Sequence, residues 1–253
     1  MSRGKFIIFY PCWNDIDWIE ASLSQIEYWV PDELYLCEGC WDNKYPARST
    51  DGTREFIEEY QKNHDNVWIV DNIRDGKYRD NQVSTCKLIL TLSEAKPNDW
   101  IMYNASDVFY FKYAIDVYKN LMENSSMDYP IFEIWNFWDS VTKYYLHKTK
   151  QAMNLPHRVL NGTAFRDTCD ITINGTHYHD SNKAMGLNVP TVAFHYEGFR
   201  VPERLEQKYD VGDRKSPVKW NNGIKLKKRQ VWTGLHPEFA LPVLKQKCFY
   251  EEI

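Results

Sequence analysis

The chain has 253 residues, a formal net charge of −4 and 43% hydrophobic residues, which is ample for a buried core. These values suit one large domain, or one domain with an extension. No apolar run reaches the ~18–20 residues of a membrane span, and Phe6–Tyr10 is too short for a signal peptide. We therefore expect a cytoplasmic protein without a transmembrane segment; the sequence leaves the oligomeric state open.

Strand and helix patterns alternate through the first half of the chain. Apolar runs predict four strands, at Lys5–Tyr10, Glu33–Glu38, Asn66–Asp71 and Trp100–Asn104. Apolar residues at helical spacing predict a first helix that carries Ile16, Ile19, Leu23, Ile26 and Val30. Two further helices are predicted at Asp51–Asn63 and Arg79–Ala95. Asn14 or Asp15 is the expected N-cap of the first helix, and Ser49 or Thr50 that of the second.

This alternation predicts an α/β fold with a mostly parallel central sheet and helices on both faces. Such sheets bind ligands at the carboxyl ends of their strands. Those ends hold Pro11–Asp15, Glu38, Asp71 and Asp107. The second half is less regular, with strands predicted at Pro130–Phe137, Ala164–Asn174 and Thr191–His195.

Two common ligand motifs are missing or incomplete. Neither Gly-rich phosphate-binding loop occurs, so a nucleotide diphosphate would need a metal ion or basic side chains to offset its charge. Cys37 and Cys40 have CxxC spacing but no second pair, and a loop rather than a helix follows Cys40. We expect these cysteines to be buried thiols.

Two motifs, in order along the chain, carry a resemblance to a known family. The strand Leu34–Gly39 leads into Arg48–Glu55, a Ser-Thr-Asp-Gly-Thr turn that opens a helix. The strand-like run Asp99–Asp107 then ends as a DXD-like motif with Ala105 at its first position. These features resemble family-2 glycosyltransferases with a GT-A (Rossmann-like nucleotide-diphospho-sugar transferase) fold. The resemblance covers about residues 5–110 well and 155–210 loosely.

The resemblance implies a metal-assisted transfer of a sugar from a nucleotide-diphosphate sugar to a hydroxyl. Asp107 would hold Mn²⁺ or Mg²⁺ on the donor diphosphate, with His195 as a further metal or diphosphate ligand. Because Ala105 supplies no carboxylate, metal affinity is expected to be weakened or supported by another group. The implied nucleotide-binding residues are Pro11, Asn14, Asp15, Glu38, Arg79 and Ser106.

The resemblance also places a general base in the second half of the chain. His179-Asp180, followed by a strand ending in His195-Tyr196, is similar to the order found in several family members. Asp180 would then deprotonate the acceptor hydroxyl, and in-line attack would invert the anomeric carbon. Asp139 and Asp170 are the next carboxylates to consider for this role.

Three other functions remain open from the same residues. His177, His179, Asp180 and His195 together with Asp107 could form a metal-dependent hydrolase site, since His-x-His on a strand places both rings on one face. A catalytically weak or inactive relative that binds a glycan or nucleic acid is favoured by Ala105. A nucleotidyltransferase would be expected to carry a Gly-rich loop after the first strand, which Pro11–Asn14 is not.

The C-terminal part carries a concentrated positive charge. Arg214–Arg229 holds seven Lys or Arg and no Asp or Glu in a chain whose net charge is negative. We expect a catalytic domain over residues 1–213 and a basic extension over 214–253 packed on the same domain. The basic stretch either folds onto the acidic surface of the domain, closes over the donor diphosphate, or contacts an anionic acceptor. Candidate acceptors are a glycan, a lipid-linked sugar or nucleic acid.

Overall fold

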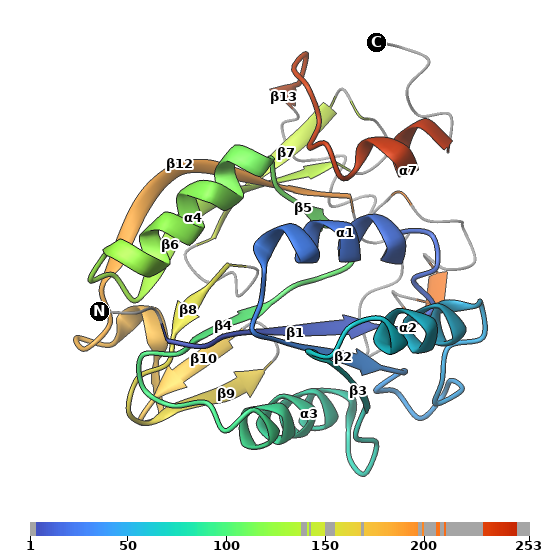
Figure 1. The fold of residues 1–253 in the computed structure, drawn as a ribbon, viewed down its shortest axis with the longest axis horizontal. Coiled ribbons are helices and arrows are strands. Elements are labelled where there is room, and N and C mark those ends of the chain that lie inside the picture. Colours follow the sequence, from blue (N-terminus) through green and yellow to red (C-terminus); the bar gives the residue numbers. More distant parts are fainter. Residues whose placement is uncertain are drawn as a thin grey trace.

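The computed structural model describes residues 4–137, 141, 143–149, 155–167, 170–196, 199, 206–207, 210 and 230–246. These residues form a mixed α/β fold whose central sheet is mostly parallel (Figure 1). The sheet has the strand order β3-β2-β1-β4-β8. Its strands are β1 (Phe6–Cys12), β2 (Glu33–Glu38), β3 (Val67–Asp71), β4 (Trp100–Tyr103) and β8 (His157–Arg158). Only β8 runs antiparallel to its neighbour, so the predicted fold class is confirmed.

Helices cover both faces of this sheet, as predicted (Figure 1). α1 (Ile19–Trp29) and α2 (Thr53–Lys62) lie on one face, and α3 (Tyr78–Leu92) lies on the other. The alternation along β1 explains the two faces, since Ile8 and Tyr10 pack with α1, whereas Ile7 and Phe9 pack with α3.

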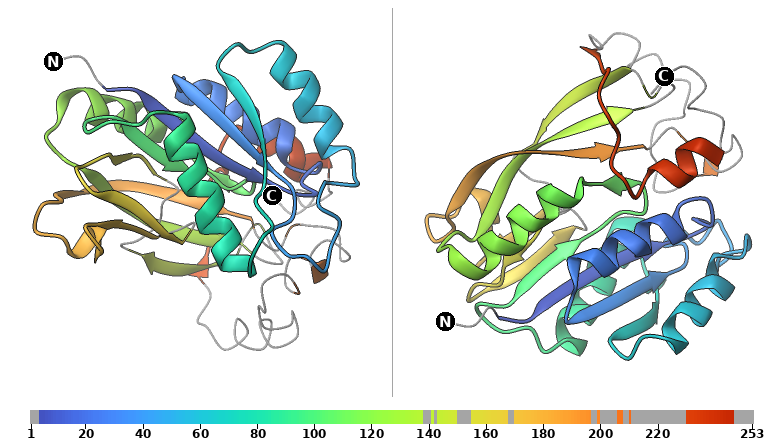
Figure 2. Two further views of the ribbon diagram at one scale, coloured as in Figure 1. Left: turned by 90° about the horizontal axis from the view of Figure 1, so that it is seen from below. Right: turned by 45° about the horizontal axis from the view of Figure 1, so that its top comes forward.

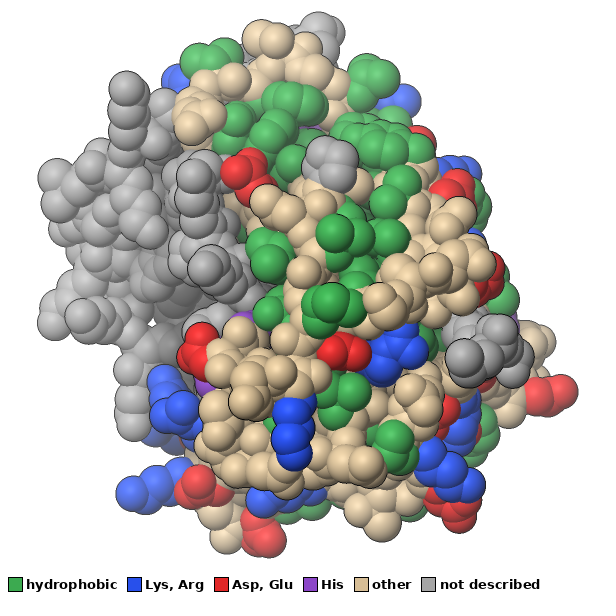
Figure 3. All heavy atoms as spheres, turned by 90° about the vertical axis from the view of Figure 1, so that its left-hand side faces the viewer, with side chains coloured by type: hydrophobic (Ala, Val, Ile, Leu, Met, Phe, Trp, Pro, Cys, Tyr) green, Lys and Arg blue, Asp and Glu red, His purple; other side chains and the backbone are tan. Residues whose placement is uncertain are grey.

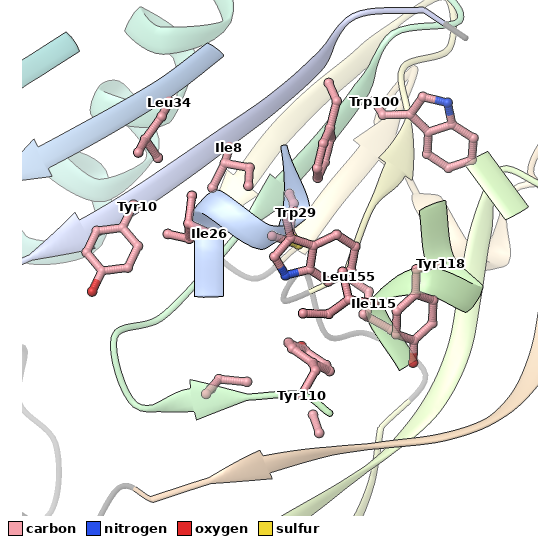
Figure 4. Close-up of a cluster of buried hydrophobic side chains, with 14 of the residues drawn as sticks. Ile8, Tyr10, Ile26, Trp29, Leu34, Trp100, Tyr110, Ile115, Tyr118 and Leu155 are labelled. Carbon is pink, nitrogen blue, oxygen red and sulfur yellow. The ribbon is translucent and has the colours of Figure 1, made fainter. Parts of the chain in front are cut away.

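The larger core cluster joins β1, β2 and β4 to α1 and α4 (Lys112–Asn124) (Figure 4). Ile8 and Leu34 come from the sheet, and Trp29 comes from the last turn of α1. Trp29 stacks against Tyr118 of α4 with ring centroids 5.8 Å apart. These large side chains fix α1 and α4 against each other and over the sheet.

A second sheet stands beside the first, with the order β13-β7-β6-β12-β5 (Figure 2). It contains β5 (Val108–Phe109), β6 (Tyr129–Phe137), β7 (Lys143–Thr149), β12 (Gly186–His195) and β13 (Gln230–Val231). β6 and β12 run parallel, so their carboxyl ends meet at one edge. β5 directly follows the turn after β4 and pairs with the last residues of β12. This pairing brings the end of β12 next to Asp107.

The predicted single strand Ala164–Asn174 is wrong in its extent. The segment instead forms two antiparallel strands, β9 (Thr163–Asp167) and β10 (Asp170–Ile173), in which Phe165 faces Ile171. Folding back lets both apolar side chains enter the core cluster on the α3 face. β11 (Thr176–His177) completes this small sheet, and the 3₁₀ turn η1 (Tyr178–Asp180) follows it.

The described C-terminal residues pack onto the second sheet. β13 pairs with β7, and Val243 and Leu244 of α7 (Leu241–Gln246) are buried in the core cluster that contains Phe194. The predicted boundary at residue 213 and the basic stretch Arg214–Arg229 lie outside the described residues. No helix among the described residues is long and apolar enough to cross a membrane.

Cys12, Cys37, Cys40 and Cys86 are buried and form no disulfide, as expected for the CxxC pair. Burial raises the pKa of Cys37 to about 12 and that of Cys40 to about 11. Both side chains are therefore thiols rather than reactive thiolates near neutral pH.

Candidate functional site

The candidate site lies where the strand order reverses. The chain moves from β1 to β2 and β3 on one side, then crosses back to place β4 on the other side of β1. The loops that leave β1 and β4 therefore diverge at their carboxyl ends, and parallel sheets bind ligands in the crevice at such a point. Two predicted groups of residues, Pro11–Asp15 and Asn104–Asp107, occupy these two loops.

Pro11 is tolerated near the end of β1 because no partner is needed there. The carbonyl of Phe9 accepts a hydrogen bond from Asn104 N, so the backbone polar groups of Phe9, and of Pro11 two residues later, point toward β4. The β1–β4 pairing ends at Phe9 and Tyr103, two residues before Pro11. The missing N–H of Pro11 therefore removes no hydrogen bond between the strands. Pro11 lies where β1 and β4 begin to diverge.

The turn Ser49–Thr53 clamps the loop after β1. Ser49 Oγ accepts from Asn14 N at 2.9 Å, and Thr53 Oγ1 accepts from Asp15 N at 2.8 Å. Asn14 Oδ1 in turn accepts from Thr50 N at 2.8 Å. Asn14 has a φ of 54°, a left-handed conformation that asparagine tolerates better than most residues. The Ser-Thr-Asp-Gly-Thr motif therefore shapes the β1 loop.

These bonds explain why the predicted helix caps are wrong. α1 begins at Ile19 after Trp18, one turn later than expected, and neither Trp18 nor Gly52 caps its helix through a side chain. The Asn14 and Ser49 side chains are occupied in the loop clamp instead.

Glu38 has a structural role that the sequence did not reveal. It is 1% exposed, and Oε1 accepts from Ser49 N at 2.7 Å. Oε2 lies 3.2 Å from Nη1 of Arg54, which also contacts Asp71 Oδ1 at 2.6 Å. Both oxygens of Glu38 are thus used within the protein. Its carboxylate holds the loop clamp in place, and a contact between Glu38 and the nucleotide stays a prediction.

We expect Arg54→Met to lower the free energy of unfolding by about 2 kcal/mol, because it removes a charged hydrogen-bond partner from the buried Glu38 carboxylate. Arg48→Met is the matched control, since Arg48 pairs with Asp71 while both side chains are about 60% exposed. An exposed pair contributes at most about 1 kcal/mol. Urea unfolding of both variants measures the difference, and equal losses would contradict the role of Arg54.

Asp107 and His195 come together from different sheets. Asp107 follows β4 and is 1% exposed, whereas His195 ends β12. The backbone bond from Tyr196 N to Asp107 O, 2.9 Å, fixes the two segments side by side. The Nε2 atom of His195 lies 3.5 Å from Asp107 Oδ1, and its Nδ1 lies 2.7 Å from Asn136 Oδ1. The pair offers one carboxylate oxygen and one imidazole nitrogen.

The donor set can be compared with the needs of a divalent cation. Ligand atoms lie about 2.1 Å from Mg²⁺ or a similar ion, so two ligands 3.5 Å apart can share one ion. The described residues contain no group of three or more His, Cys, Asp or Glu side chains that could hold a metal. The pair therefore fits an ion of the kind that takes few protein ligands and completes its shell with phosphate oxygens and water.

The remaining predicted nucleotide-binding residues lie at the same end of the sheet. Asp15 is buried and its Oδ2 accepts from Trp13 N at 3.1 Å. Ser106 is buried beside Asp107. Arg79 is exposed in the first turn of α3, which follows the carboxyl end of β3. Whether these residues bind a nucleotide stays a prediction.

Asp180 does not join this cluster. η1 lies against Tyr129, whose ring centroid is 4.5 Å from that of His179, and Tyr129 pairs in register with Gly186. His195 is the register partner of Asn136, seven residues after Tyr129 on β6, so the two ends of this strand pair are roughly 23 Å apart at ~3.3 Å per residue. Figure 3 looks onto the end of the molecule that holds η1. The structure therefore does not bring Asp180 together with Asp107 and His195, and its role as the general base stays a prediction.

The hydrolase alternative fails for the same reason. His177 and His179 are neighbours with ring centroids 5.3 Å apart, but His195 lies at the opposite end of β12. Of the other carboxylates considered for the base, Asp139 lies outside the described residues, and Asp170 begins β10 in the small sheet.

Two residues at the site escaped the sequence prediction. Asn136 is the register partner of His195 on β6, a position that only the strand pairing reveals. His236 is buried, with Nδ1 2.7 Å from Tyr196 Oη and Nε2 3.0 Å from the carbonyl oxygen of Val141. It ties the C-terminal segment to the residue after His195. Neither belongs to a motif, so no sequence signal marks them.

Comparison with known proteins gives weak structural similarity. No protein-family model matches the sequence, and no curated protein matches it. Two crystal structures of S. aureus TarS share 16% identity with the chain over 54% of its length. The TM-scores are 0.36 for the structure described as TarS 1-349, of which 36% is covered, and 0.30 for the other, of which 22% is covered. The chain thus spans about a third or less of these proteins, and this similarity does not establish a function.

Proposed function

We propose that the protein is a GT-A glycosyltransferase that moves a sugar from a nucleotide-diphosphate sugar to a hydroxyl acceptor. The observation that carries the proposal is the pairing of Asp107 with His195 at the strand-order reversal, beside the clamped β1 loop. This is the edge at which a parallel sheet binds ligands, and it presents oxygen and nitrogen donors rather than a Gly-rich loop.

In this proposal Asp107 and His195 hold Mn²⁺ or Mg²⁺ against the donor diphosphate. Such an ion, when bound, offsets the negative charge that develops on the departing nucleotide. The β1 loop from Pro11 to Asp15 would lie against the base and ribose. Hydrogen bonds to Ser49 and Thr53 set the shape of this loop. Arg79 and Ser106 are proposed for the diphosphate side, where Arg suits bidentate phosphate contacts.

Inversion at the anomeric carbon, the acceptor and the cellular location are further parts of the proposal. The acceptor would be a glycan, a lipid-linked sugar or a nucleic acid, with the basic stretch Arg214–Arg229 as its proposed contact. A cytoplasmic location is supported by the four buried cysteines of the described residues, which form no disulfide and suit a reducing compartment.

We expect thermal unfolding to shift upward when a matching nucleotide sugar is added with Mn²⁺, and to shift much less without the ion. A ligand at 100 times its dissociation constant stabilises the folded state by about 2.7 kcal/mol. A panel of nucleotide sugars read by thermal shift measures this. No shift with any donor in the presence of Mn²⁺ would count against the proposal.

Ala105 favours a second candidate, a relative that binds a nucleotide sugar or glycan without turnover. It stands where the first carboxylate of the motif would be and packs against the main core cluster. Release of nucleoside diphosphate from a donor that binds separates the two candidates, because only the transferase turns the donor over.

A further inference from the structure

The hydrogen bonding of His195 is set by a residue outside every predicted motif. Asn136 lies on β6 and is the register partner of His195 on the neighbouring parallel strand β12. It is 7% exposed. Its Oδ1 atom lies 2.7 Å from His195 Nδ1. An amide oxygen only accepts hydrogen bonds, so Nδ1 must carry the proton in this arrangement.

This protonation has a consequence for the other ring nitrogen. In a neutral imidazole with Nδ1–H, Nε2 carries a lone pair, and here it faces Asp107 Oδ1 at 3.5 Å. Two acceptors that face each other across this distance gain nothing from a direct hydrogen bond. They are suited to a shared cation, because an imidazole binds metal through its unprotonated nitrogen.

The orientation of the Asn136 amide therefore decides what the pair can do. If the amide were turned over, Nδ2 would donate to Nδ1, and His195 would donate Nε2–H to Asp107. That closed pair would leave no lone pair on His195 Nε2 for a cation. In the orientation that the structure has, Oδ1 faces His195 Nδ1, and the buried Nδ2 atom has no hydrogen-bond partner among the described residues.

We propose that Asn136 is a positioning residue that holds His195 as the Nδ1–H tautomer and turns Nε2 toward a divalent cation shared with Asp107. The inference rests on the proposed function for the presence of that cation. Removal of a residue that hydrogen-bonds to a metal ligand typically weakens metal affinity by about 10- to 100-fold.

The tautomer can be read without any metal, from the ¹⁵N chemical shifts of His195 in long-range ¹H–¹⁵N NMR spectra. We expect Nδ1–H in the wild type and in Asn136→Asp, whose carboxylate also accepts from Nδ1. In Asn136→Leu we expect Nε2–H, because Asp107 is then the acceptor that remains. Asn188→Leu is the matched control, since Asn188 is an exposed asparagine earlier on β12, and it should keep the wild-type tautomer.

Titration of the metal-free protein with Mn²⁺, followed by EPR, gives the second readout. We expect binding about 10- to 100-fold weaker in Asn136→Leu, wild-type affinity in Asn188→Leu, and rescue in Asn136→Asp. Nε2–H in the wild type, or Nδ1–H that persists in Asn136→Leu, overturns the role of Asn136.

The two proposals fail in different ways. A wild-type protein that binds no Mn²⁺ overturns the shared cation here and metal assistance in the proposed function. A wild-type protein that binds Mn²⁺ through Asn136-dependent His195, but binds no nucleotide sugar, overturns the proposed function and supports the inference.

Discussion

Asp107→Asn should lower kcat/KM for sugar transfer by roughly 10²- to 10³-fold, the loss typical when one electrostatic stabiliser of a developing charge is removed. The asparagine keeps the size of the side chain but removes the negative charge that faces His195 Nε2. Mn²⁺-dependent donor binding should weaken in parallel. Steady-state kinetics and thermal shift with a donor that binds the wild type measure both effects.

Asp180→Asn is the control for that prediction. Asp180 is an exposed carboxylate in η1, at the other end of β12 from His195. We expect wild-type kinetics in this variant, in contrast to the role that the sequence suggested. A large loss in Asp180→Asn with little change in Asp107→Asn would reverse the assignment of the site.

The protein should lose stability steeply as the pH falls below about 6.5. Burial lowers the pKa of His157 to about 3 and that of His179 to about 4, and it also lowers the pKa of His236 to about 4. Histidines in an unfolded chain titrate near 6.5. Between these values the unfolded state binds more protons than the folded state, so the free energy of unfolding falls as the pH falls.

The expected size follows from His157, which is 1% exposed and stacked on Tyr129. One such group costs about 1.4 kcal/mol per pH unit, or ~2 kcal/mol between pH 6.5 and pH 5. His179 and His236 add to this in the same direction. Asp128 acts in the opposite direction, because burial raises its carboxyl pKa.

Urea unfolding at pH 7.5, 6.5, 5.5 and 5.0 measures this dependence. His157→Phe should keep the stacking on Tyr129 and give a shallower slope, since it removes a titrating group. An unfolding free energy that stays constant from pH 7.5 to 5.0 would show that these imidazoles are protonated or solvated in the folded state.

The local pattern of the first 104 residues determined the four parallel strands of the central sheet. Apolar runs separated by helical spacing specify strand, helix and order, and the right-handed crossover rule then restricts how parallel strands connect. For this reason β1 to β4, the helices on both faces and the position of Asp107 at a strand end could be predicted. α4 was missed although its pattern is regular, since Ala114, Ile115, Tyr118 and Met122 recur at helical spacing and are buried.

The tertiary structure alone decided which polar residues share the site. A one-dimensional pattern does not record strand register or which ends of a sheet meet, so His179-Asp180 looked equivalent to other polar strand ends. Pairing of β12 with β6 and β5 placed His195 beside Asp107 and Asn136, and left Asp180 at the far end. Likewise, the sequence marked Glu38 as an acid at a strand end, but only packing showed that Ser49 and Arg54 occupy both of its oxygens. Such contacts join residues that lie far apart in the chain, so their energies are set by the folded arrangement.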